Sequence, residues 1–142
     1  MSRLMSADEA RDFLTYGTRT AKLATTRLDG RPHVVPVWFV VDGEDVVFMT
    51  GASSVKGRAL RRDPHVCLCV DDENPPFSYV MVEGQASVTE DGGEMLRMAT
   101  AIGRRYMGAQ RGEEFGRRNA VPGELLVRVR PEHVRAEAEI AG

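Results

Sequence analysis

From Ser78 to Glu90 the chain reads Ser-Tyr-Val-Met-Val-Glu-Gly-Gln-Ala-Ser-Val-Thr-Glu, which is the clearest alternation of side chains in the sequence. Successive side chains of a β-strand point to opposite faces, so small apolar residues share one face and polar residues share the other. The first set is Val80, Val82, Gly84, Ala86 and Val88, and the second is Glu83, Gln85 and Ser87. This segment therefore predicts a strand with one face against a core.

Strand patterns continue on both sides of this segment. Upstream they cover residues 20–27, 33–41, 46–50 and 65–70, and downstream a last strand covers 124–130. Asp29-Gly30 and Asp42-Gly43 separate the first three stretches, and Asp-Gly pairs are typical of tight hairpin turns. We therefore expect these three strands to pair in succession, each antiparallel to the one before it.

Helical patterns occupy the segments between the third and fourth strands and between the fifth and sixth: residues 55–63, 92–106 and 113–120. Ser6 and Glu9 form a capping-box pattern for a further short helix before the first strand. The helix from residue 55 is expected to end before Pro64, because the residue before a proline disfavours helix. Met95 and Met98 have the spacing of core residues on one helix face.

Six short strands with few helices between them favour an antiparallel arrangement, because a parallel sheet would need more crossovers. A closed or partly split barrel also avoids the unpaired edges of an open six-stranded sheet. The sequence therefore predicts a mainly β fold, a six-stranded antiparallel split β-barrel with a few short helices. Its 142 residues have the length of one ordinary domain, so we expect residues 1–142 to form a single domain.

The composition is that of a soluble globular protein, with 42% apolar and 28% charged residues. No apolar run reaches the roughly 20 residues of a membrane span, and the N-terminus lacks the apolar stretch of a secretion signal. We therefore expect a cytoplasmic protein with no membrane partner. The net charge is -2 and aromatic residues make up only 6%, which argues against nucleic acid as a partner.

Neither a metal site nor a catalytic motif stands out. The three histidines are far apart, and Cys67 and Cys69 form a lone C-x-C with too few ligands for zinc. We expect these cysteines to be buried, reduced thiols. Motifs for a serine nucleophile and for nucleotide phosphates are also absent, so we assign no catalytic residue. If the protein is an enzyme, a bound cofactor is expected to carry the chemistry.

A strand runs directly into a helix start at Thr50-Gly51-Ala52-Ser53-Ser54-Val55-Lys56. The first N–H groups of a helix lack partners and the helix dipole is positive there, so the position attracts an anion. Ser53 or Ser54 could cap the helix or donate to a phosphate, and Lys56, one of only two lysines, adds a cation. The pattern fits a phosphate site and also a serine-capped surface helix with a solvated basic face. Residue spacing alone does not decide between them.

Pro36 stands inside the predicted strand 33–41 and cannot donate a ladder hydrogen bond. It therefore marks an edge, a bulge or a split in the barrel, and it leaves neighbouring backbone groups free to contact a planar ring. Trp38, the only tryptophan, follows shortly after it. This side chain is either a core residue or a platform on which a ring stacks.

Six short motifs appear in order along the chain: Leu23-Ala24-Thr25, Asp29-Gly30-Arg31-Pro32, Pro36-Val37-Trp38-Phe39, Thr50 to Lys56, Leu60-Arg61-Arg62-Asp63-Pro64 and Val82-Glu83-Gly84-Gln85-Ala86. Together they resemble the pyridoxamine 5'-phosphate oxidase-like split-barrel proteins, especially the branch that uses the deazaflavin coenzyme F420. The resemblance implies a homodimer with two cofactor sites at its interface. The C-terminal substrate-phosphate pattern of a true pyridoxamine phosphate oxidase is missing, which argues against vitamin B6 oxidation.

The resemblance also implies which residues bind the cofactor. Its phosphate would be held by the segment that contains Met49, Thr50, Ser53, Ser54, Val55 and Lys56. Arg58 or Arg61 would assist with the acidic tail, and the ring would lie along Val35, Pro36, Val37 and Trp38. Phe77 and Tyr79 would be supplied by the partner subunit.

These assignments imply an oxidoreductase in which reduced F420 transfers a hydride to a small unsaturated or quinone-like substrate. Two alternatives remain open at this point. One is an FMN-dependent oxidase or reductase of the same fold, and the other is a flavin or deazaflavin carrier without enzymatic activity.

Overall fold

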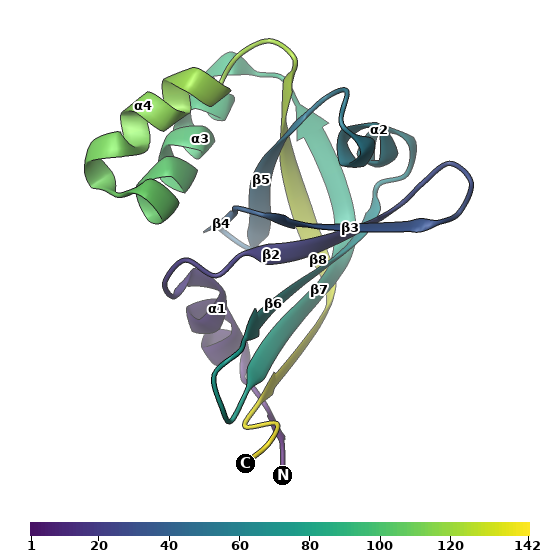
Figure 1. Cartoon of the computed structure of the whole chain (residues 1–142), viewed down its shortest axis with the longest axis vertical. Coiled ribbons are helices and arrows are strands. Elements are labelled where there is room, and N and C mark those ends of the chain that lie inside the picture. Colours follow the sequence, from purple (N-terminus) through teal and green to yellow (C-terminus); the bar gives the residue numbers. More distant parts are fainter.

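The computed structural model describes residues 1–142, which form one antiparallel sheet and four helices (Figure 1). The strands are β1 (Arg3–Leu4), β2 (Ala21–Thr26), β3 (Pro32–Val37), β4 (Val40–Asp42), β5 (Asp45–Gly51), β6 (His65–Asp72), β7 (Ser78–Thr89) and β8 (Glu124–Ala138). The helices are α1 (Ala7–Thr15), α2 (Val55–Arg62), α3 (Gly92–Met107) and α4 (Ala109–Asn119). None of these helices is long and apolar enough to cross a membrane.

The sheet is open between two strands that are adjacent in the chain. Its strand order is β3-β2-β6-β7-β8-β5-β4, and β1 pairs with β8 off this path. The two end strands, β3 and β4, are separated only by Trp38 and Phe39, yet they belong to opposite ends of the sheet. This is the split of a split barrel, and the predicted mainly β, antiparallel fold class is confirmed.

The structure has eight strands where the sequence predicts six. The expected strand 33–41 breaks into β3, which pairs with β2, and β4, which pairs with β5. Both expected hairpins form, β2 with β3 and β4 with β5, but the middle strand is broken, so β5 pairs with β4 and β8 and not with β3. The two extra strands are β4, which is the second half of the expected strand 33–41, and the two-residue β1.

Side chains of α3 take over the backbone hydrogen bonds that the break leaves unpaired. The Phe39 N–H donates to the Tyr106 hydroxyl over 3.2 Å, and the Phe39 carbonyl accepts from Arg105 Nη1 over 2.8 Å. Buried backbone groups need such partners, whether from a ladder or from a side chain. The break is therefore a built feature of the fold, and α3 stabilises it.

The last strand runs to Ala138, well beyond the expected end at residue 130. It passes Pro131, which has no N–H, through a register shift opposite Glu83 and Gly84. At Gly84 a β-carbon would lie 2.1 Å from the Arg130 carbonyl oxygen, so only glycine fits this crossing. The bulge lets β8 continue its pairing with β7 beyond Pro131, past the end of its pairing with β5 at Val129.

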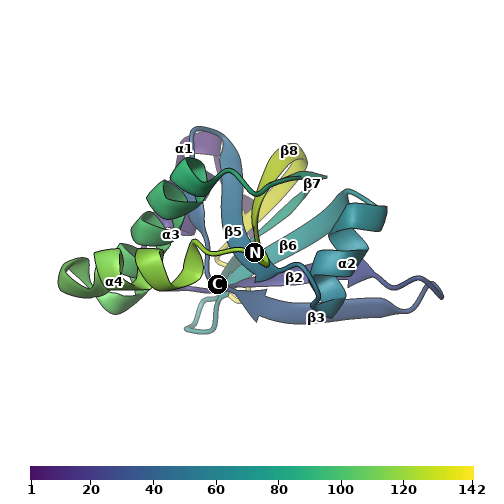
Figure 2. The same ribbon diagram turned by 90° about the horizontal axis from the view of Figure 1, so that it is seen from above.

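The main core fills the inner side of the sheet, and α3 covers part of the outer side. Leu23, Leu68 and Phe48 are fully buried in the inner core. On the outer side Met95 and Met98 of α3 pack against Val47 and Leu126, as their spacing predicts. Seen from above, α3 and α4 flank one side of the strands and α2 the other (Figure 2).

An ion-pair cluster reinforces the attachment of α3 to the sheet. Arg128 of β8 contacts Asp42 at 2.9 Å and Glu94 of α3 at 2.6 Å, and it also reaches Asp45 at 3.5 Å. The hydrogen bond from Arg128 lowers the pKa of the Asp42 carboxyl below its usual range. One arginine therefore joins β8, the β4–β5 hairpin and α3.

Cys67 and Cys69 are free thiols, but they are only half-buried. Alternate residues of β6, Val66, Leu68 and Val70, fill the inner core, so the two cysteines face the outer side of the sheet. The expectation that both thiols are buried is wrong for this reason. The burial that remains raises the pKa of each thiol above its ordinary value.

Candidate functional site

The turn between β5 and α2 is held by the hydroxyls of Thr50 and Ser54. Ser54 is the N-cap of α2; its Oγ accepts from the Gly57 N–H over 3.0 Å and donates to the Gly51 carbonyl over 2.8 Å. Thr50, only 4% exposed, lies with its hydroxyl 3.0 Å from the same oxygen. Both hydroxyls are thus engaged in shaping the turn, while Ser53 is exposed at its tip.

Gly57 allows the helix to start directly against the end of β5. A β-carbon on Gly57 would lie 2.2 Å from the Gly51 carbonyl oxygen, far inside van der Waals contact. The first turn of α2 and the last residue of β5 therefore touch backbone to backbone. This close approach fixes the direction in which the first helical N–H groups point.

A pocket of about 240 Å³ opens beside this helix start. Five of its lining residues are among those predicted from the sequence: Pro36, Val37, Trp38, Met49 and Lys56. Four more were not predicted: Ile102, Phe115, Asn119 and Glu124. The structure therefore brings the Pro36–Trp38 segment and Lys56, which the sequence treats as two separate signals, onto one surface.

Aromatic side chains form one wall of the pocket. Trp38 stacks on Tyr106 of α3, with ring centroids 4.9 Å apart and planes 6° from parallel, and Phe115 of α4 lies 5.6 Å away. Trp38 is 40% exposed, so it is neither a buried core residue nor a free surface group. Burial raises the pKa of the Tyr106 hydroxyl, which donates to the Arg19 carbonyl over 2.9 Å. Tyr106, against which Trp38 stacks, is therefore held by a hydrogen bond to the backbone.

Two opposite charges line the same pocket. Lys56 projects from the first turn of α2, and Glu124 starts β8 directly opposite Gly51. The Glu124 Oε2 atom is buried and accepts no hydrogen bond, from Lys56 or from any other residue. An ionised carboxylate is a strong acceptor, so leaving one of its oxygens buried and unpaired is costly.

Other predicted residues lie around the helix start or away from it. Val55 and Arg58 are exposed on α2, and Arg61 pairs with Glu90 at 3.5 Å and so reaches toward the end of β7. Val35 is partly buried and packs against the inner core. These four residues do not line the pocket.

Phe77 and Tyr79 occupy a separate hollow at the opposite end of the sheet, next to Lys22 and Asp71. Phe77 is 39% exposed, and the Tyr79 hydroxyl donates to Glu137. Figure 1 places the turn before β7 near the chain termini, whereas α2 lies at the far end of the sheet. Within one chain these two residues cannot reach a ligand held by Lys56.

The residues that sequence reasoning missed come from α3, α4 and the start of β8. Three glycines allow α3 and α4 to pack closely; at Gly116, for example, a β-carbon would lie 2.2 Å from the Thr100 hydroxyl oxygen. Gly103 and Gly112 leave equally little room. Glycines at these positions in two successive helices were the available signal for a helical hairpin. Nothing in the sequence alone placed that hairpin beside Trp38.

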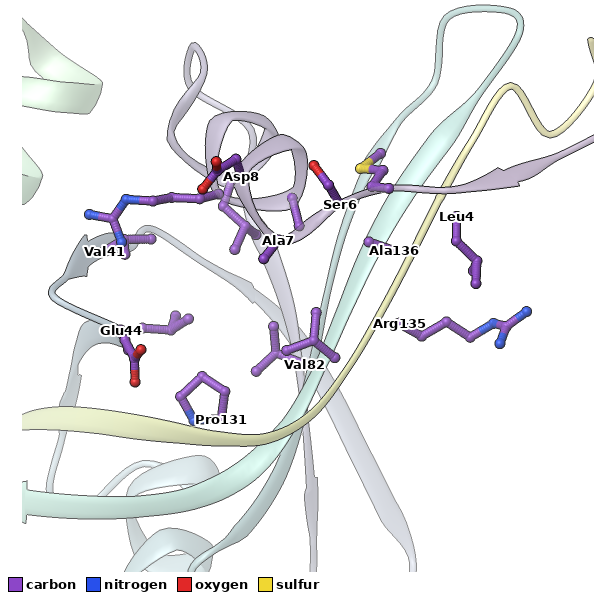
Figure 3. Close-up of a pocket in the computed structure, with 16 residues that line it drawn as sticks. Leu4, Ser6, Ala7, Asp8, Val41, Glu44, Val82, Pro131, Arg135 and Ala136 are labelled. Carbon is purple, nitrogen blue, oxygen red and sulfur yellow. The ribbon is translucent and has the colours of Figure 1, made fainter.

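A larger hollow of about 690 Å³ lies beneath α1, between that helix and β8 (Figure 3). Most of its lining is apolar, including Val82, Pro131 and Ala136, with charged groups such as Asp8 and Arg135. It contains none of the residues that the sequence assigns to a cofactor. We therefore take the smaller pocket beside Lys56 as the candidate site.

The family model described as pyridoxamine 5'-phosphate oxidase matches residues 6–138, nearly the whole chain. The chain belongs to this family. Membership confirms the resemblance drawn from the ordered motifs. No curated protein matches the chain at a significant level.

Solved structures of this fold align along most of the chain. A conserved hypothetical protein of Mycobacterium tuberculosis is 28% identical, with a TM-score of 0.85, over 96% of this chain and 86% of that one. An F420 reductase is 25% identical, with a TM-score of 0.67, over 87% and 94%. An FAD-binding protein of Mycobacterium smegmatis shares the fold at 24% identity and a TM-score of 0.65, over 96% and 99%.

Proposed function

We propose that this chain is an oxidoreductase that binds reduced F420 in the pocket beside Lys56 and directs its hydride to a small unsaturated or quinone-like substrate. One observation carries the proposal. A cation at a helix start and an aromatic-walled strand break line the same pocket, as a phosphate-bearing ring cofactor requires. The similarity to an F420 reductase supports this choice of cofactor.

The residues present fit such a cofactor. Lys56 and the free N–H groups of the α2 start would bind the phosphate, because both offer positive charge at one point. Trp38, held against Tyr106, would orient the ring beside the backbone of the Pro36 segment. Glu124 adds a carboxylate to the same lining.

When bound, reduced F420 supplies the hydride, and the protein supplies position and environment. Ile102 and Phe115 would exclude water from one edge of the ring, because they form the apolar side of the pocket. The stacked Trp38 would limit the tilt of the ring and so hold its reactive carbon toward the substrate. No side chain of the pocket has to take part covalently.

The first test titrates purified protein with F420 and with FMN. Fluorescence quenching measures the binding of each cofactor. We expect Lys56→Ala to weaken binding of either phosphate-bearing cofactor by about tenfold, the loss of one charge-assisted hydrogen bond. Arg31→Ala is the matched control, because Arg31 pairs with Asp29 in the exposed β2–β3 turn.

The outcomes separate the candidate functions. Binding of F420 with turnover of a quinone-like acceptor supports the proposal, and tight binding of FMN instead supports an FMN-dependent oxidoreductase. Binding without turnover for any pair of reductant and acceptor identifies a carrier. If wild-type protein binds neither cofactor, the proposal is wrong.

We also propose that the working form is a homodimer in which each chain completes the site of the other. The pocket of about 240 Å³ is smaller than the roughly 300–1,000 Å³ of typical ligand sites. The exposed Phe77 and the half-buried Tyr79 are too far from Lys56 within one chain to contribute. Val34, 64% exposed on the edge strand β3, leaves apolar surface for a partner to cover.

Mixing two defective variants tests this arrangement. We expect Lys56→Ala and Phe77→Ala each to weaken cofactor binding when pure. After the two proteins are mixed and exchanged, about a quarter of the sites regain wild-type affinity, because each hybrid dimer has one site with both native residues. Titration with cofactor measures this fraction. No recovery, together with a sedimentation mass of one chain, would contradict the dimer.

A further inference from the structure

The strand β8 has a stretch of open edge between two of its partners. On one side β7 pairs with it from Leu126 to Glu137. On the other side β5 pairs only as far as Val129, and the pairing with β1 begins only at Glu137. Residues 130–136 of β8 therefore have a neighbouring strand on one side and none on the other.

Val134 presents unpaired backbone groups on this open side. The Met5 N–H donates to the Ala136 carbonyl over 2.9 Å, so the backbone of Ala136 faces away from β7. Backbone groups of alternate residues in a strand point the same way, so the N–H and carbonyl of Val134 face the open side too. Neither has a partner there, and Val134 is 53% exposed. A residue placed opposite Val134 would gain two hydrogen bonds.

The hollow of about 690 Å³ beneath α1 adjoins this open edge, and its volume lies within the range of typical ligand sites. Val46 and Val82 line it and belong to the main core, so the hollow reaches the interior of the barrel. Figure 3 shows Val82 pointing from the sheet toward α1. Ala7 and Ala10 of α1 face the same space, and their small side chains leave it open.

Side chains on the open edge share the face that borders the hollow. Val134 stands directly opposite Val82 in the β7–β8 ladder, so both side chains lie on the inner side of the sheet. The exposed Val134 side chain is thus an inner-face residue that nothing in the chain covers. An open hydrogen-bonding edge and an apolar hollow therefore meet along one strand.

An extended peptide matches both features at once. Its backbone would pair with Val134, and its alternate side chains would enter the hollow. An apolar molecule without an amide would fill the hollow but leave the Val134 N–H and carbonyl unpaired. The rim carries both signs of charge, Asp8 and Glu44 against Arg11 and Arg135, so it selects no net charge in the ligand.

We infer that the hollow beneath α1 is a peptide-binding site in which a short extended segment of another protein adds to the open edge of β8. The stretch 131–135 spans roughly 16 Å, the length of about five residues of strand. Apolar side chains at the first, third and fifth positions of the bound segment pack into the hollow. The site shares no residue with the pocket beside Lys56, and the inference does not depend on the proposed function.

The test uses three pentapeptides with acetylated and amidated ends. Each has threonine at the second and fourth positions and valine, leucine or phenylalanine at the other three. Nuclear magnetic resonance of the full-length protein follows the backbone amides during titration. We expect saturable shifts and slower hydrogen exchange of the Val134 N–H, with the signals of Lys56 and Trp38 unchanged. N-methylation of the central peptide residue should weaken binding by about tenfold or more, because the donor to the Val134 carbonyl is lost.

Val134→Pro tests the same contact from the side of the protein. Proline removes an N–H that has no partner in the free chain, so we expect the melting temperature to stay close to that of wild type. Peptide affinity should fall by about tenfold or more. Val134→Ala is the matched control, because it keeps the N–H, and it should lose less affinity. If the proline variant does not fold, the N-methylated peptide still makes the comparison on wild-type protein.

Three results would overturn the inference. They are no saturable binding of any of the three peptides at millimolar concentration, equal affinity for the N-methylated and unmodified peptides, and shifts centred on Trp38 instead of Val134. The second result would mean that the hollow takes apolar groups without strand pairing. A failure of F420 and FMN to bind would contradict the proposed function alone.

Discussion

Gly57→Ala is expected to lower the free energy of unfolding by about 2 kcal/mol and to weaken cofactor binding by about a hundredfold. In an ordinary helix this substitution stabilises by about 0.5–1 kcal/mol, because alanine is the better helix former. Here the added β-carbon would lie 2.2 Å from the Gly51 carbonyl oxygen, which belongs to backbone and cannot rotate away. The start of α2 must therefore move, and the N–H groups proposed to hold the phosphate move with it.

Urea unfolding measures the first effect and fluorescence titration with F420 or FMN the second. Gly92→Ala is the matched control, since Gly92 begins α3 and a β-carbon added there would meet nothing within 4 Å. We expect that variant to be as stable as wild type or slightly more so. Equal stability of the two variants would show that α2 does not depend on its contact with Gly51.

Arg105→Met is expected to lower the free energy of unfolding by about 3 kcal/mol. Arg105 is half-buried and donates to three backbone carbonyls: Gly17 over 2.9 Å, Phe39 over 2.8 Å and Leu14 over 2.7 Å. Methionine keeps much of the aliphatic stem but leaves all three carbonyls without this donor. The barrel split at Phe39 and the end of α1 therefore both lose the hydrogen bonds that Arg105 donates.

Arg104→Met is the control, because Arg104 is the preceding residue of α3 and its only ion pair, with Glu113, is exposed and 4.0 Å long. An exposed pair of this kind contributes little, so we expect a change below about 0.5 kcal/mol. Denaturant unfolding of both variants gives the comparison. If both lose the same stability, charge on the helix matters and the carbonyl contacts do not.

The local elements of this protein were largely readable from the sequence. The alternation in β7, the Asp-Gly turns and the Ser6–Glu9 capping box all depend on residues close together in the chain, and the structure contains each of them. The pairing of β5 with β8 was not readable in this way. Its partner β8 is far away in sequence, and the break at Trp38 and Phe39 depends on Arg105 and Tyr106 of a distant helix.

The residues of the candidate site also fall into two groups, those that the sequence marked and those that only the structure added. The sequence alone marked Lys56, the serines before α2 and the Pro36–Trp38 segment, because a helix start and a proline in a strand have local physical consequences. Only the tertiary structure placed these signals on one pocket and added Phe115 and Glu124 to its lining. The α3–α4 hairpin and the start of β8 reach the pocket through long-range packing and strand register, which no local pattern specifies.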